Sequence, residues 1–418
     1  MKLKISNTSN TVLALFLYLS LILGFLYNEN LNYGAYYDWI NSSSRVISDF
    51  SNNFFETFLN YDDYGHRHSP IYLIFLSIFL DLGFTVDVIR IIHLHISILL
   101  IFFFYKCLKL NFHTIDNKYL VLLSLVIFLS PTYRSLSIWP DSRLPGLLFF
   151  VLTIYFFLKF KRTNIFKYTW FTCISLIISS YISPNFSIFF VYFFFFFFKK
   201  FELSKLSLLI LFNFLAALPI FYYIFILDVN FLTAGKTPSL TDHAISLNFN
   251  LSNKLMIISS IIFFHLSPII LNNKFYKFFL QFLTKKAIIL IILTTILAYF
   301  FNYQVAFTGG GIFFALSHLL FDNNYLFFII SFFSIGFVYY ISSLDSKNFY
   351  LLILLIMSNL QNSIYHKYYE PLIMIMFFTL FSNVDASNFL KKKINLIYIY
   401  ALSIIYILMR LYKIQYLV

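Results

Sequence analysis

Long apolar runs recur from one end of this chain to the other, and they restrict its fold more than any other feature. Of the 418 residues, 60% are hydrophobic and only 11% are charged, whereas a soluble domain has about 25% charged residues. A helix needs about 20 predominantly apolar residues to cross the hydrocarbon core of a bilayer. The sequence therefore predicts an all-α, polytopic transmembrane helix bundle without a sizeable soluble domain.

We expect about thirteen membrane crossings, with the N-terminus inside. The first follows Lys2 and Lys4 and lacks a small-residue cleavage site, so it is interpreted as a retained helix and not as a signal peptide. The expected crossings lie near residues 11–27, 88–105, 119–130, 142–159, 168–182, 185–198, 206–227, 255–271, 287–301, 325–341, 349–361, 371–382 and 394–413.

The distribution of charge supports this orientation. Lysines such as Lys199 and Lys200 gather in the loops assigned to the inside, whereas most acidic residues fall in the loops assigned to the outside. The net charge of +13 is therefore interpreted as a topology signal, and no nucleic-acid partner is expected.

Two apolar stretches do not fit the scheme of crossings. Pro70 to Leu80 is short, and it is predicted to be an amphipathic helix on the outer surface, at the end of the long loop from Asn28 to Ser69. Phe307 to Leu320 contains Gly309-Gly310-Gly311 and is predicted to be a re-entrant or interfacial segment, because irregular backbone at membrane depth must be buried in protein or line a wet cavity.

Three acidic residues of the first long outer loop are candidate catalytic residues. A general base needs a carboxylate or imidazole within hydrogen-bonding reach of the hydroxyl that it deprotonates. Asp38 follows the first helix closely enough to stay at the membrane surface, while Asp62 and Asp63 lie farther along the loop.

Asp62, Asp63, His66 and His68 are also residue types that bind divalent cations. Their spacing matches no strong metal motif, so no metal site is predicted, although a divalent cation stays an alternative. We favour a hydrogen-bonded surface network between these side chains and Arg67.

Arginines on the outer face are candidate phosphate-binding residues. Arg134 and Arg143 lie on the side that is usually depleted of basic residues, and a guanidinium suits bidentate capture of phosphate better than an ammonium does. Asp141 lies between them at a predicted helix N-terminus, where a capping role is the alternative. Arg90 enters the second helix, where ionisable groups normally face the bundle or a wet cavity. An interface pair with Asp87 is its alternative role.

Several aromatic, histidine and lysine residues have more than one interpretation. Trp39 and Trp139 lie near predicted helix ends, where they belong either to an aromatic belt or to a sugar-stacking surface. His265 and His318 are isolated in the sequence and are interpreted as polar residues that pack inside the protein. Lys367 lies on the outer side, flanked by tyrosines that suit a sugar ring or a lipid.

The order of these features forms a recognisable pattern. A retained first helix and an outer loop with an early Asp are followed by His68-Ser69-Pro70-Ile71-Tyr72, Arg90, Ser130-Pro131 through Pro140-Asp141, Lys159-Phe160-Lys161-Arg162 and Lys367-Tyr368-Tyr369-Glu370-Pro371. This pattern resembles the GT-C superfamily of membrane glycosyltransferases. It is similar in particular to the polyprenyl-phosphate-sugar-dependent members, such as protein O-mannosyltransferases and lipid A aminoarabinose transferases. Many members have two adjacent acids after the first helix, whereas Asp38 is followed by Trp39 here, so the catalytic place stays open between Asp38, Asp62 and Asp63.

The resemblance implies an inverting transfer of a sugar from a polyprenyl-phosphate donor to a lipid-linked or glycan hydroxyl. It implies that an acidic side chain is the general base and that cationic side chains stabilise the departing phosphate, and we hypothesise that the base is Asp38. The expected location is a bacterial inner (plasma) membrane, with the active site on the outer face. The candidate substrate- and phosphate-binding residues are Arg67, His68, Arg90, Arg134, Asp141, Arg143 and Lys367. The whole chain, 1–418, is expected to form one membrane domain, with a GT-C-like part at 1–227 and variable C-terminal helices at 228–418.

Other functional classes stay open. An O-antigen-polymerase-like or ligase-like enzyme also needs outer-face arginines, but it uses an oligosaccharide-diphosphate donor. A transporter or flippase is expected to have pseudo-symmetric halves with broken helices, and only the segment Gly309-Gly310-Gly311 suggests one. A non-catalytic membrane scaffold is a further alternative.

Overall fold

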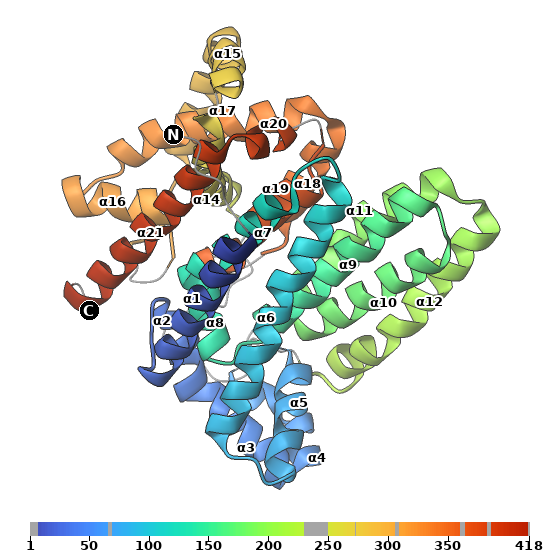
Figure 1. The fold of residues 1–418 in the computed structure, drawn as a ribbon. Helices are drawn as coiled ribbons and strands as arrows, with labels where there is room; N and C mark the ends of the chain where they lie inside the picture. The colour runs from blue at the N-terminus through green and yellow to red at the C-terminus, as the bar shows by residue number, and fades with distance from the viewer. Residues whose placement is uncertain are drawn as a thin grey trace. The chain divides into compact units, whose positions relative to one another are not determined.

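All the regular secondary structure that is described in this chain is helical, as the sequence predicts (Figure 1). The computed structural model describes residues 7–65, 69–229, 250–271, 273–305, 309–359, 364–382 and 386–416. Within these ranges, eight helices are long and apolar enough to cross a membrane. They are α1 (Asn7–Leu26), α6 (Val86–Asn111), α9 (Arg143–Thr163), α12 (Leu203–Phe221), α14 (Leu251–Ile270), α15 (Asn273–Tyr299), α17 (Tyr325–Leu344) and α21 (Lys393–Tyr416). Such a set is compatible with an integral multi-pass membrane protein.

The expected number of about thirteen crossings is not confirmed. The crossing expected near 119–130 is part of a bent pair, which raises the number of spans in the described residues to nine if the pair counts as one. The other four expected crossings correspond to helices that are shorter than a span. They are α10 (Lys167–Ile182), α11 (Phe190–Lys200), α18 (Ser346–Met357) and α19 (Leu372–Thr379), with 16, 11, 12 and 8 residues.

The bent pair has a local cause. α7 (Asn117–Leu125) and the 3₁₀ helix η3 (Val126–Leu129) meet α8 (Pro131–Ile138) at 67°. The break falls at Ser130, which has the extended backbone angles φ −75° and ψ 117°. A residue before proline is pushed out of the α region by the proline ring, and Pro131 has no N–H to continue the helix.

The described chain divides into two compact units, and each is described by itself. Unit 2 comprises Leu13–Asn111 and Tyr133–Ser246. In this unit, α10 packs along α9, and α6 packs against α9, as the green and cyan helices in Figure 1 illustrate. α9 and α10 approach each other closely at Gly146, which has no side chain. The hydroxyl of Ser179 on α10 donates to the Gly146 carbonyl at 2.7 Å.

Replacing Gly146 with alanine is expected to destabilise unit 2. A Cβ atom at this position would lie 2.6 Å from the Cβ of Ser183, which cannot move without its backbone. Overpacking of this kind costs about 1–3 kcal/mol in the free energy of unfolding. Denaturation of the full chain in detergent measures the change, and Arg162→Ala, at an exposed position on the same helix, is the control. Equal stability of Gly146→Ala and the control would contradict the expected clash.

The first long loop of unit 2 is itself helical. It contains α2 (Tyr33–Asp38), the π-helix η1 (Trp39–Ser43), α3 (Ser44–Asn52), α4 (Phe54–Leu59) and the 3₁₀ helix η2 (Tyr61–Tyr64), and it leads into α5 (Pro70–Asp81). The hydroxyl of Ser69 accepts the N–H of Ile71, and Pro70 occupies the first turn, so α5 begins where the sequence predicts. α5 packs against α3, and its residues Tyr72, Leu73 and Leu76 are buried.

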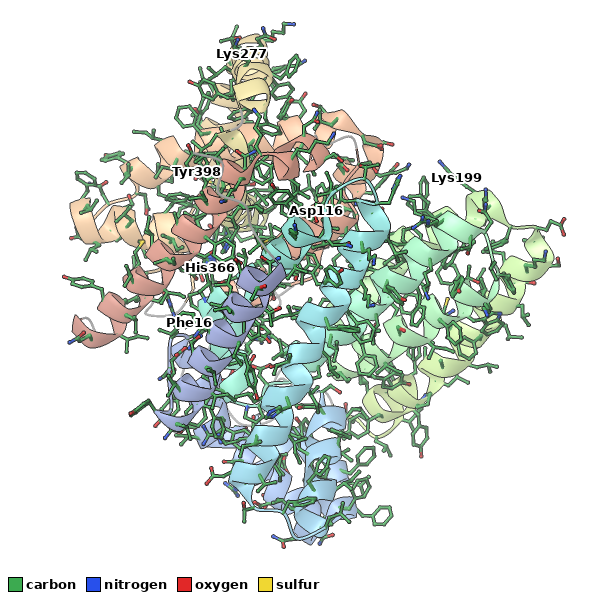
Figure 2. The ribbon with its side chains drawn as sticks, viewed as in Figure 1. Phe16, Asp116, Lys199, Lys277, His366 and Tyr398 are labelled. Carbon is green, nitrogen blue, oxygen red and sulfur yellow. The ribbon has the colours of Figure 1, made fainter. Side chains whose placement is uncertain are left out.

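Unit 1 comprises Met1–Val12, Phe112–Thr132 and Leu247–Val418. Its central helix, α14, contacts α15, α16 (Ile312–Phe321), α17, α18, α19 and α21, the yellow to red helices in Figure 1. Figure 2 labels Lys277 on α15 and Tyr398 on α21, in the same unit.

The glycine segment of unit 1 is irregular, as expected. Gly309, Gly310 and Gly311 have φ values of 107°, 75° and 80° and directly precede α16, while Phe307 lies outside the described residues. Only glycine adopts such angles without strain. The N–H of Gly310 donates to the carbonyl of Ile364 at 3.1 Å, so this irregular backbone is bonded inside the protein.

Candidate functional site

The residues predicted from the sequence fall into three groups. Arg67 and His68 lie outside the described residues. Lys367 belongs to unit 1, where it is 8% exposed and lies 5.9 Å from the centroid of the Tyr365 ring. The others belong to unit 2: Asp38, Asp62, Asp63, Arg90, Arg134, Asp141 and Arg143.

The three candidate acids of unit 2 differ in their surroundings. Asp38 is half-buried at the last position of α2, where the chain continues into the π-helix η1. π-helical turns are rare and occur frequently at functional sites. Asp62 is 5% exposed, whereas Asp63 is exposed and lines an open polar groove of about 680 Å³.

Arg90 connects three segments of unit 2. Its Nη2 donates to Oδ1 of Asn28 at 2.9 Å, and its Nε donates to the carbonyl of Ile138 at 3.4 Å. Its guanidinium lies 4.0 Å from the centroid of the Trp139 ring, a cation–π distance. It also pairs with Asp87 at 3.3 Å, which is the interface pair that its spacing suggests. These contacts hold the exit of α1 against the end of α8.

Arg134 forms a bidentate pair that the sequence did not reveal. Its Nε and Nη2 donate to the two carboxylate oxygens of Glu29 at 2.7 and 2.5 Å, and it also donates to the side chain and carbonyl of Ser20. A Cβ at Gly24 would lie 2.6 Å from Oε2 of Glu29, so this glycine makes room for the pair. Glu29 directly follows the first apolar run, and that position is the only sequence signal for its role.

The segment that contains Asp38 touches the segment that contains Arg143. Tyr36, two residues before Asp38, contacts the Trp139 ring edge-on at 4.8 Å between centroids. The backbone N–H of Asn32 donates to the hydroxyl of Ser135 at 2.7 Å. Trp139 and Trp39 are 4% and 5% exposed, so neither ring offers an open stacking surface.

Asp141 and Arg143 form the N-terminus of α9. Oδ1 of Asp141 accepts the N–H of Arg143 at 2.8 Å, which is the capping role that the sequence gives as an alternative. Its Oδ2 lies 4.0 Å from Nη1 of Arg143, and the two side chains are 3% and 12% exposed. The first-turn N–H groups of α9 are bonded to Asp141 and Ser142, so the guanidinium of Arg143 is the group here that favours a bound anion.

Unit 1 contains a cluster of three titratable side chains that sequence reasoning missed. His265 of α14, His366 of the 3₁₀ helix η6 (His366–Tyr368) and Glu370 have potential ligand atoms within 4.8 Å of one another (His366 is labelled in Figure 2). The Nε2 atoms of His265 and His366 are 3.1 Å apart, and Oε2 of Glu370 accepts the hydroxyl of Thr132 at 2.9 Å. The interpretation of His265 as a lone packing residue is therefore incomplete.

Burial governs the charge of this cluster. It lowers the pKa of His366 well below its usual value, and the nearby charges of His265, Arg410 and Lys413 lower it further. Burial also raises the pKa of Glu370. His366 is consequently neutral at pH 7, which leaves one ring nitrogen as an acceptor or ligand.

Comparisons of the chain with protein-family models, with characterised proteins and with solved structures give no match.

Proposed function

We propose that this chain is a membrane glycosyltransferase that moves a sugar, with inversion, from a polyprenyl-phosphate donor to a hydroxyl of a lipid-linked or other glycan acceptor. The observation that carries the proposal is the contact between two segments of unit 2. The Tyr36–Trp139 and Asn32–Ser135 contacts hold the segment that ends in a carboxylate, Asp38, against the segment that leads to Arg143. A base and a phosphate-binding cation are the two parts that this transfer needs.

In the proposed reaction, the carboxylate of Asp38 removes the proton from the acceptor hydroxyl. The acceptor oxygen then forms a bond to the anomeric carbon, and the bond from that carbon to the phosphate oxygen breaks. The phosphate leaves with the electron pair, so negative charge grows on it. The guanidinium of Arg143, at the start of α9, is suited to stabilise that charge.

The polar groove of unit 2 suits a glycan acceptor. Its lining is rich in amide and carboxylate side chains, which donate to and accept from sugar hydroxyls. These include Asn41, Asn52, Asn53, Asn60, Glu56 and Asp63. We also propose that the loop helices α2 to α5 lie at the outer surface of a bacterial plasma membrane. The bundle then has about thirteen crossings, with the short helices counted as crossings.

Reconstitution of the full chain in liposomes tests this function. Candidate polyprenyl-phosphate sugars are supplied together with lipid-linked glycan acceptors, and the release of free polyprenyl phosphate is measured. We expect one donor to release polyprenyl phosphate in proportion to the sugar transferred. Release of polyprenyl diphosphate from an oligosaccharide-diphosphate donor, or lipid movement without cleavage, would contradict the proposal in favour of the ligase-like or flippase alternatives.

Arg143→Ala is expected to reduce the transfer rate by about 10²- to 10³-fold, because the variant loses a positive charge beside the departing phosphate. Arg143→Lys, which keeps the charge but not the bidentate geometry, is expected to retain more activity. Single-turnover transfer measures the effect, with Arg162→Ala at the opposite end of α9 as the control. Wild-type rates for Arg143→Ala would remove Arg143 from the phosphate site.

A further inference from the structure

We propose that His265, His366 and Glu370 of unit 1 bind one divalent transition-metal ion, with Zn²⁺ as the preferred metal. The three residues come from α14, from η6 and from the position shortly before α19, and their potential ligand atoms lie within 4.8 Å of one another. The inference does not depend on the proposed sugar transfer, because it uses only contacts inside unit 1.

The donor set is one that zinc uses. Two imidazole nitrogens and one carboxylate, with a fourth position left open, form the ligand set of several catalytic zinc sites. Metal–ligand bonds of about 2.0–2.2 Å in a tetrahedron separate neighbouring donor atoms by roughly 3.3 Å. The Nε2 atoms of His265 and His366 are already 3.1 Å apart. The candidate ligand atom of Glu370 lies within 4.8 Å of those of both histidines.

Outer contacts orient two of the ligands. When Nε2 of His366 is a ligand, the ring proton is on Nδ1, and Nδ1 lies 3.3 Å from the hydroxyl oxygen of Tyr406. The hydroxyl of Thr132 donates to Oε2 of Glu370 at 2.9 Å, which restricts the orientation of the carboxylate. A metal-binding imidazole almost always donates its other N–H, and a metal-binding carboxylate is in turn hydrogen-bonded, as both are here.

The cluster also has space and an entry path. A cavity of about 40 Å³, lined by His265, Glu370 and Tyr406, exceeds the 10–15 Å³ that one water needs, so an ion with a bound water fits. His366 and Tyr406 also line an open groove of about 790 Å³, through which an ion can enter.

Metal content of the purified full chain tests the site. The protein in detergent is loaded with Zn²⁺, passed over a desalting column and analysed by mass spectrometry of the metal. We expect about one zinc ion per chain in the wild type, a tetrahedral Co²⁺ absorption spectrum after exchange, and loss of both in His366→Ala and in His265→Gln. Thr132→Val is expected to weaken zinc affinity by about 10- to 100-fold, since it removes the contact that orients Glu370.

The matched control is His113→Gln, an exposed histidine in the loop between α6 and α7, and this variant is expected to bind zinc like the wild type. Size-exclusion elution monitors folding. If a histidine variant does not fold, Glu370→Gln and chelator titration of the wild type decide the question. Absence of stoichiometric zinc in the wild type, or equal zinc in the wild type and in every folded ligand variant, would overturn the proposal and leave the histidine pair as a hydrogen bond only.

Discussion

Asp38→Asn is expected to lower the rate of sugar transfer by about 10²- to 10⁴-fold, because the amide has nearly the same shape as the carboxylate but accepts no proton. Asp38 is half-buried at the end of α2, so the neutral substitution is expected to leave the fold intact. Single-turnover transfer with the donor identified by reconstitution gives the rate, and thermal unfolding in detergent gives the stability.

Asp62→Asn and Asp63→Asn are the matched controls, because the sequence leaves the catalytic place open among the three acids. Asp62 is buried and Asp63 lines the polar groove, so each tests a different location for the base. A near-normal rate in Asp38→Asn together with a large loss in one of the other variants would move the base to that residue. Near-normal rates in all three variants would contradict base catalysis by this loop.

Glu29→Ala is expected to lower the free energy of unfolding by about 3–5 kcal/mol, because it leaves the guanidinium of Arg134 buried without its carboxylate. The side chains of Arg134 and Glu29 are only 8% and 19% exposed, and the pair is bidentate. Chemical denaturation of the full chain in detergent measures the loss.

The control is Asp87→Ala, which removes the carboxylate of a second arginine pair in the same unit. The side chain of Asp87 is 79% exposed, and its pair with Arg90 is therefore expected to contribute only about 0–1 kcal/mol. Replacing both Glu29 and Arg134 with apolar residues of similar volume is expected to recover most of the lost stability. Equal stability of Glu29→Ala and Asp87→Ala would contradict this account of the buried pair.

Part of the candidate site was predictable because its contacts are local. Arg90 and Asp87 are one helical turn apart, and their pair follows from that spacing. Asp141 precedes a helix by two residues, so its capping bond to the N–H of Arg143 is also a local feature. The partner of Arg134 was not predictable, because Glu29 lies 105 positions away and nothing in the spacing connects them.

The sequence by itself determined that this chain is an all-helical protein with many apolar spans, because hydropathy and length are properties of about 20 consecutive residues. The tertiary structure decided which apolar runs are full spans, where Ser130 breaks one of them, and which polar residues meet. His265 and Glu370 are far apart in the chain, and His265 looks like an isolated residue. They form a cluster only because α14 and the segment before α19 pack in the same unit, and such contacts between distant segments leave no periodic pattern in the sequence.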